Sequence, residues 1–155
     1  MKKLVILRGN SGSGKTTVAR ALQRKIGFNT MLISQDEIRR NMLWVKDGID
    51  TKALPLMIEL LKYGNEHSDI VILEGIMYDE WYNPLFNVAN ELYGANVYSY
   101  YFHIKLDMNF DYLFRSSYMP EKPVFTGFSG IFRIGRNSHI FLYPLRFLLS
   151  KVVKK

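Results

Sequence analysis

The feature that most constrains this chain is a glycine-rich run, GNSGSGKT, at positions 9–16. It fits the pattern G-x-x-x-x-G-K-[ST] at every fixed position. Glycines let the backbone curl until several N–H groups point inward, where they bind phosphate oxygens. The context fits too, because the β-compatible apolar run Lys2–Leu7 precedes it and the amphipathic segment Lys15–Ile26 follows it. The run therefore predicts a phosphate-binding loop between a buried strand and a helix.

The polar side chains of this loop have expected roles in holding a nucleoside triphosphate. The helix that begins at Lys15 adds the partial positive charge of its N-terminus. Lys15 is expected to reach the β- and γ-phosphates, and the Thr16 hydroxyl to ligate Mg²⁺. The residues expected to bind the nucleotide are Gly9, Asn10, Ser11, Gly12, Ser13, Gly14, Lys15, Thr16 and Thr17.

The rest of the chain alternates short apolar runs with amphipathic segments. Further strands are expected at Thr30–Ile33, Asp69–Leu73, Asn96–Ile104 and within Arg133–Leu142. Helices are expected at Gln35–Leu43, from Asp50 or Thr51 to near Gly64, at Trp81–Tyr93, at Asn109–Ser117 and at Leu145–Lys155. Strands that alternate with helices predict a parallel sheet covered on both faces, so the fold class is α/β. The length fits a single domain over residues 1–155.

The segment after the second strand carries candidate substrate-handling residues. In an open α/β sheet ligands lie beyond the carboxyl ends of the strands, which is where we expect Asp36. Its carboxylate can accept the proton of a substrate hydroxyl that attacks the γ-phosphate. Arg39, about one helical turn further on, can bind an anionic group of the substrate. Ser34 and Glu37 are expected to form a capping box at the start of this helix. The alternative role for Asp36 is to stabilise the helix N-terminus by its negative charge.

Glu74 ends the apolar run Asp69–Leu73 and is the candidate metal-binding carboxylate. A carboxylate at a strand end beside a phosphate loop can hold Mg²⁺, usually through water. Gly75 follows it and lets another group approach closely. The alternative is an acidic residue that faces solvent. We expect Thr16 and Glu74 to form the metal site.

Three stretches, RGNSGSGKTTVARAL, SQDEIRR and DIVILEG, together resemble the small P-loop kinases of the zeta-toxin and chloramphenicol-phosphotransferase type. The combination of phosphate loop, Asp36 and Arg39 is also similar to 5′-hydroxyl polynucleotide kinases. The resemblance covers residues 1–104. It implies a P-loop NTPase fold with a five-stranded parallel sheet flanked by helices, as in nucleoside-monophosphate kinases. It also implies ATP as phosphoryl donor, a hydroxyl acceptor, Asp36 as base and Arg39 as substrate contact.

Residues 105–155 diverge from these kinases. The segment DMNFDYLFR loosely resembles the start of their lid helix and places Arg115 in the lid, where an arginine stabilises charge on the transferring phosphoryl group. The alternative for Arg115 is a surface position on an amphipathic helix. The following stretch, FTGFSGIFRIGRNSHIFLY, is aromatic and contains glycines where a charged lid is expected, and leaves Arg133 and Arg136 as further lid candidates.

Bulk composition limits the partners. The net charge is +7, and residues 103–155 hold 9 Lys and Arg against 3 Asp and Glu. Such a basic third favours an anionic partner, which is a nucleotide, a nucleic acid or a lipid surface, or else forms a solvated face. There is no cysteine, so disulfides and thiolate metal sites are excluded. The apolar stretches at Leu4–Leu7 and Ile140–Leu149 are too short for a signal peptide or a membrane span, which predicts a cytoplasmic protein.

These observations together predict an ATP-dependent phosphotransferase that moves the γ-phosphate to a hydroxyl of a small molecule or nucleotide. One alternative is a 5′-hydroxyl nucleic-acid kinase that uses the basic C-terminal third to bind the backbone. The other is an ATP-binding or ATPase module without an acceptor, which requires a residue that orients the attacking water, and the sequence offers no candidate for it. The acceptor and the oligomeric state stay open.

Overall fold

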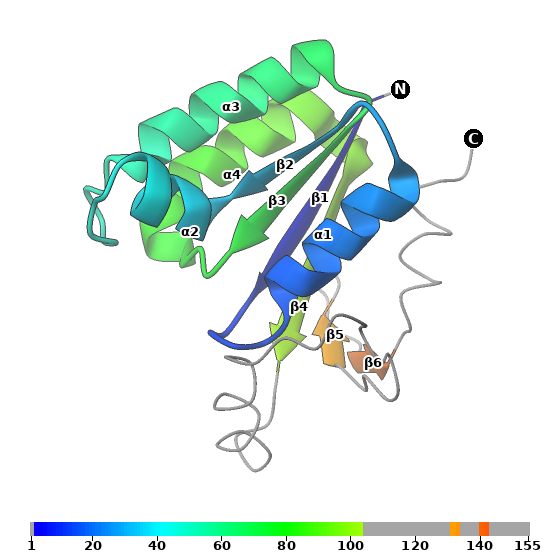
Figure 1. The fold of residues 1–155 in the computed structure, drawn as a ribbon, viewed down its shortest axis with the longest axis horizontal. Coiled ribbons are helices and arrows are strands. Elements are labelled where there is room, and N and C mark those ends of the chain that lie inside the picture. Colours follow the sequence, from blue (N-terminus) through cyan, green and yellow to red (C-terminus); the bar gives the residue numbers. More distant parts are fainter. Residues whose placement is uncertain (1, 104–130, 134–139, 143–155) are drawn as a thin grey trace.

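In the computed structural model, which describes residues 2–103, 131–133 and 140–142, one sheet forms the centre of the fold (Figure 1). Its strand order is β2-β3-β1-β4-β5-β6, and the first four of these run parallel. The strands are β1 (Lys3–Gly9), β2 (Thr30–Ser34), β3 (Ile70–Gly75), β4 (Val97–His103), β5 (Ile131–Arg133) and β6 (Ile140–Leu142). Parallel strands need crossover connections, and helices supply them here.

Helices cover both faces of the parallel strands (Figure 1). Helix α1 lies on one face, whereas α3 and α4 lie side by side on the other. The helical elements are α1 (Lys15–Ile26), α2 (Gln35–Glu37), the π-helix η1 (Ile38–Met42), α3 (Ala53–His67), α4 (Asp79–Tyr93) and the 3₁₀ turn η2 (Gly94–Asn96). The predicted three-layer α/β fold is confirmed.

The central strand β1 supplies both halves of the core because its side chains alternate between the two faces of the sheet. Val5 and Leu7 pack with Ala19 and Leu22 of α1. Leu4 and Ile6 belong to the second cluster, which joins the sheet to α3 and α4. All four side chains of this run are buried. A strand covered on both faces is apolar throughout, and for this reason the run was recognisable in the sequence.

At the β4 edge, the sheet differs from the expected five parallel strands. The described part contains four parallel strands, and β5 pairs antiparallel with β4. β6 in turn pairs antiparallel with β5, so neither of these two strands extends the parallel part of the sheet. The expected helices at Asn109–Ser117 and Leu145–Lys155 lie outside the described residues. That one domain spans residues 1–155 stays a prediction.

The expected capping box after β2 is wrong. Ser34 makes no capping hydrogen bond, because its hydroxyl donates to the Glu74 carboxylate instead. The helix expected over Gln35–Leu43 is α-helical only in α2 and continues as η1, in which Leu43 N donates to Ile38 O at 2.9 Å. Single π turns of this kind are frequent at functional sites.

Among the described residues, no helix is long and apolar enough to cross a bilayer.

Candidate active site

The loop between β1 and α1 curls back at the carboxyl edge of the sheet (Figure 1). Gly9, Gly12 and Gly14 all have positive φ angles, of 146°, 71° and 80°. Gly14 is left-handed directly before α1, a conformation that few other residues adopt. At Gly9 a Cβ atom would lie 2.2 Å from the carbonyl oxygen of Phe102 on β4, so only glycine fits there. The predicted loop is thus curved, and Asn10, Ser11 and Gly12 are exposed to solvent.

Lys15 is folded into this loop and is only 6% exposed. Its ammonium group donates to the backbone oxygen of Asn10 at 2.6 Å and to Ser13 Oγ at 3.1 Å. Burial lowers the pKa of Lys15, and the nearby carboxylates of Glu74 and Asp36 act in the opposite direction. The amine therefore occupies the inside of the loop and has two negative side chains within electrostatic range.

Glu74 at the end of β3 is 2% exposed and accepts hydrogen bonds from two hydroxyl groups. Thr16 Oγ1 lies 3.2 Å from each of its carboxylate oxygens, and Ser34 Oγ donates to Oε1. The expected pair Thr16 and Glu74 is thus brought together, with Ser34 as a partner that the sequence did not reveal. This cluster contains only oxygen atoms, and hard cations such as Mg²⁺ prefer oxygen ligands. The residues present fit a magnesium ion. Thr17 is exposed beside Thr16 in the first turn of α1.

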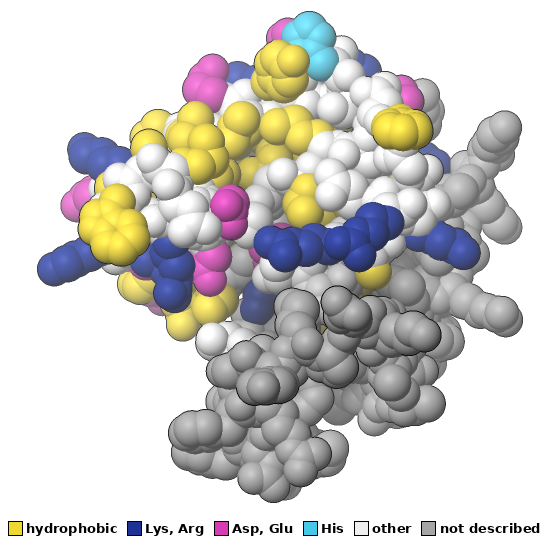
Figure 2. Space-filling view, viewed as in Figure 1, with side chains coloured by type: hydrophobic (Ala, Val, Ile, Leu, Met, Phe, Trp, Pro, Cys, Tyr) yellow, Lys and Arg dark blue, Asp and Glu magenta, His cyan; other side chains and the backbone are white. Residues whose placement is uncertain are grey.

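Asp36 and Arg39 share one side of the α2–η1 segment, as the sequence predicts. Arg39 Nη2 lies 3.0 Å from Asp36 Oδ1, and Arg40 Nε lies 3.2 Å from the same oxygen. The Arg39 side chain is 15% exposed, against 64% for Arg40 and 50% for Asp36. Asp36 is therefore an accessible carboxylate held by a nearly buried cation. Figure 2 shows Lys and Arg side chains over α1 and beside the α2–η1 segment, with acidic side chains between the two.

A buried hydrogen-bond network positions the backbone next to Asp36. The Gln35 side-chain amide donates to Asp47 Oδ2 at 2.9 Å and to the Tyr82 hydroxyl at 2.8 Å, and its oxygen accepts from Ile76 N at 3.0 Å. The Tyr82 hydroxyl in turn donates to Asp47 Oδ1 at 2.7 Å. Burial, followed by the hydrogen bond to Asp47, raises the pKa of Tyr82, so the phenol stays a donor. A Cβ atom on Gly75 would lie 2.6 Å from Gln35 Cβ, so Gly75 gives this amide its space.

The sequence did not reveal this network, because its members are ordinary residues from three separate segments. Gln35, Asp47 and Tyr82 belong to α2, to the connection before α3 and to α4. The one available signal was Gly75, which was expected to let another group come close, and that group is Gln35.

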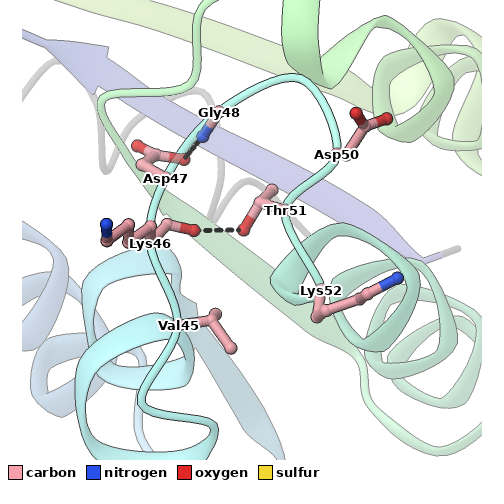
Figure 3. A pocket seen from close by; sticks show the side chains of 7 residues that line it. All are labelled: Val45, Lys46, Asp47, Gly48, Asp50, Thr51 and Lys52. Atoms are coloured by element: carbon pink, nitrogen blue, oxygen red, sulfur yellow. Dashed lines mark hydrogen bonds between the residues drawn. The ribbon is translucent and has the colours of Figure 1, made fainter.

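A hollow of about 270 Å³ lies within residues 45–52, as Figure 3 shows. Its polar groups largely bond to each other: Thr51 Oγ1 donates to the Lys46 oxygen at 3.0 Å, and Gly48 N donates to Asp47 Oδ1 at 3.1 Å. These bonds fix the turn before α3, which in turn places Asp47 beside Gln35. We assign the hollow a structural role.

Arg115 and Arg136 lie outside the described residues, and Arg133 is described only as part of the backbone of β5. Where these arginines lie relative to the loop stays a prediction.

A glycine loop joining the central strand to a helix, with a lysine inside it and a threonine beside a strand-end carboxylate, defines a P-loop NTPase fold. Residues 4–104 match the family described as AAA domain, and the chain belongs to that family. The resemblance to small P-loop kinases concerns the same part of the chain and agrees with this match.

The fold also occurs among solved structures. The crystal structure of APE1195 is 20% identical, with a TM-score of 0.53, over 75% of this chain and 69% of that chain. The APS kinase CysC of Mycobacterium tuberculosis is 20% identical with a TM-score of 0.48, over 64% and 74% of the two chains. A gluconokinase from Sinorhizobium meliloti 1021 is 17% identical with a TM-score of 0.47, over 66% and 58%. No curated protein matches the sequence.

Proposed function

We propose that this protein is an ATP-dependent kinase that transfers the γ-phosphoryl group to a hydroxyl group of its substrate. The observation that carries the proposal is the meeting of three elements at one edge of the sheet. These are the loop with Lys15, the hydroxyl–carboxylate pair of Thr16 and Glu74, and the accessible carboxylate of Asp36. A phosphoryl transfer needs a phosphate cradle, a metal site and a group that receives the acceptor's proton.

The loop is proposed to bind the triphosphate through its backbone N–H groups and Lys15. In the structure the Lys15 ammonium donates to Asn10 O and Ser13 Oγ. Phosphate oxygens would replace these neutral acceptors, and a charged acceptor makes a stronger hydrogen bond to an ammonium group. The first turn of α1, with Thr16 and Thr17, lies at the positive end of the helix dipole and favours the same anion.

Thr16 and Glu74 are proposed to hold Mg²⁺, Thr16 directly and Glu74 through water. A bound magnesium ion would neutralise charge on the β- and γ-phosphates. Ser34 donates to Glu74 and so fixes the orientation of that carboxylate from the neighbouring strand.

Asp36 is proposed to receive the proton of the acceptor hydroxyl. The acceptor oxygen forms its bond to the γ-phosphorus while the bond from that phosphorus to the β–γ bridging oxygen breaks, so the products are a phosphorylated acceptor and ADP. Arg39, which holds Asp36 Oδ1, is proposed to orient the carboxylate and contact the substrate. Arg115 is proposed as the lid arginine that stabilises charge on the transferring group.

The test of this proposal is acceptor-dependent release of ADP from ATP–Mg²⁺, measured with a panel of hydroxyl compounds. Asp36→Asn keeps the shape of the side chain and removes the base, so kcat should fall about 100-fold or more while the KM for ATP changes little. Glu37→Gln is the matched control, because Glu37 is the exposed neighbour and bonds only Asn41 among the described contacts. ATP hydrolysis without any acceptor that stays equally fast in Asp36→Asn would instead identify an ATPase.

A further inference from the structure

A second cavity, of about 320 Å³, opens beside the phosphate loop. It lies where β1 and β4 end and where the connection from β3 enters α4, a region visible at the carboxyl edge of the sheet in Figure 1. We call it the Tyr78–Tyr101 cavity. Its lining includes Arg8, Asn10, Ile76, Tyr78, Asp79 and Tyr101.

The cavity lies between the phosphate loop and the backbone that follows β3. Asn10 belongs to the phosphate loop, and its backbone oxygen accepts a hydrogen bond from Lys15. Ile76, on the other side, is held through its N–H by the Gln35 side chain, and Gln35 directly precedes Asp36. A molecule in the cavity would therefore contact the phosphate loop at one end and, at the other, the Ile76 backbone that the Gln35 side chain holds.

The lining favours a ring that carries hydroxyl groups. Tyr78 is 53% exposed and packs edge-on against Trp81, with ring centroids 4.9 Å apart, so its ring is held in place although it faces solvent. Tyr101 is 37% exposed, and its hydroxyl donates to Asn10 Oδ1 at 3.1 Å. Fixed aromatic faces next to hydroxyl and amide groups suit a ligand with an apolar ring face and polar edges.

The charge of the described lining disfavours an anionic ligand. Its one cation, Arg8, already pairs with Asp79 at 2.8 Å and lies over the ring of Phe86 at 4.7 Å. The Arg8 side chain is 20% exposed, and its position between a carboxylate and an aromatic ring leaves little of its charge for a ligand. The lining also includes Glu80, so it carries two carboxylates against one paired guanidinium. An anionic acceptor would therefore find no unpaired cation in the described lining.

We propose that the Tyr78–Tyr101 cavity is the acceptor site, and that the acceptor is a neutral ring compound rich in hydroxyl groups, of the size of a sugar or a nucleoside. Tyr78 and Tyr101 determine its specificity. This inference rests on the proposed kinase function and narrows the open substrates of that function, because it favours a neutral acceptor over a nucleic-acid end with its phosphodiesters.

The structure provides a built-in reporter for the test. The chain has two tryptophans, Trp44 and Trp81, so the variant Trp44→Phe leaves only the one that touches Tyr78. This protein is titrated with D-glucose and uridine as neutral probes, which separate the sugar and nucleoside sources. Glucose 6-phosphate and a 5′-hydroxyl oligothymidylate are the anionic probes. ATP-dependent ADP release is measured with the same four compounds.

We expect a saturable change in Trp81 emission and acceptor-dependent ADP release with at least one neutral probe, and at least tenfold weaker binding of both anionic ones. Tyr78→Ala in the same background should raise the dissociation constant and lower kcat/KM for that probe about tenfold. Tyr101→Phe loses the hydrogen bond to Asn10 and should also lower kcat/KM for that probe. Tyr63→Ala is the matched control, because Tyr63 is 57% exposed on α3 and stacks on His67. It should change neither value.

The inference is overturned if neither neutral probe binds, if the oligonucleotide is the better acceptor, or if Tyr78→Ala behaves as Tyr63→Ala does. Failure of the underlying kinase proposal looks different. In that case ATP is not consumed with any of the four compounds, while saturable binding of a neutral probe at Trp81 still supports the cavity as a ligand site.

Discussion

At Lys15, the burial of a charged group opposes the stability of the fold. In the proposed function its ammonium group reaches phosphates from a buried position, although a buried cation loses hydration. Two neutral oxygen atoms and the field of Glu74 and Asp36 offset only part of that loss, since burial is the largest influence on its pKa. We therefore expect Lys15 to lower the stability of the fold at neutral pH.

Lys15→Met should consequently raise the free energy of unfolding of the free protein at neutral pH, by about 1 kcal/mol. The folded-state pKa of Lys15 is lowered, so the unfolded chain binds more protons, and the wild type gains stability as the pH rises toward the ordinary value of 10.5. The difference in the free energy of unfolding between the variant and the wild type should thus become smaller in alkaline buffer.

Urea unfolding at several pH values measures this difference, and Lys62→Met on the exposed side of α3 is the control. A Lys15→Met variant that is less stable than the wild type at neutral pH would show that the two hydrogen bonds outweigh the burial.

At the scale of the elements, α1 has the bounds Lys15–Ile26 that the sequence predicts. Its start is fixed by the glycine loop and its end by Gly27, which has a φ of 100°. β1 and β3 were predictable for the same kind of local reason, because buried parallel strands read as apolar runs. Elements whose ends depend on a local signal can be predicted from sequence.

The elements around Asp36 could not be predicted as well, because distant partners decide them. Ser34 looks like a helix cap in sequence, but the buried Glu74 carboxylate, forty residues away, is the stronger acceptor for its hydroxyl. Gln35 likewise depends on Asp47 and Tyr82, which no local pattern connects with it. Asp36 and Arg39 lie together after β2, as the sequence predicts, whereas the groups that hold them were not predicted. The roles of both residues in binding and catalysis stay predictions.

Tyr82→Phe removes one hydroxyl from this network and leaves the Asp47 and Gln35 side chains short of a partner. We expect a loss of about 1–3 kcal/mol in the free energy of unfolding. We also expect a lower kcat with little change in the KM for ATP, because the Asp36 backbone loses a support. Tyr93→Phe is the control, since among the described residues that buried hydroxyl makes a single contact, of 3.4 Å with Leu61 O. Equal unfolding midpoints for the two variants would contradict the account of the network.

The junction between β1 and the loop gives a second prediction at this scale. Gly9→Ala should destabilise the protein by more than about 2 kcal/mol, because the added methyl group collides with the β4 backbone at Phe102. Gly27→Ala has a positive φ too but open space around the new atom, so it should cost about 1 kcal/mol. Thermal unfolding of both variants separates steric collision from backbone strain, and a milder effect at Gly9 than at Gly27 would refute the close approach.

For the molecule as a whole, the parallel order β2-β3-β1-β4 assembles the site. Register pairs Ser34 with Glu74 and Gly9 with Phe102, so groups far apart in sequence meet at one edge. The class of fold followed from the sequence, because the glycine loop and alternating elements admit few alternatives. The Tyr78–Tyr101 cavity could not be predicted from the sequence, since it forms only where three strand ends and α4 come together.

The central claim is that residues 9–16 bind the phosphates of ATP through the loop and Lys15. Calorimetric titration of ATP–Mg²⁺ into the wild type and Lys15→Met tests it most directly. We predict one saturable site in the wild type and binding weaker by about 10- to 100-fold in the variant, which loses charged hydrogen bonds to the phosphates. Equal affinity in the two proteins, or no binding to the wild type, would contradict the account.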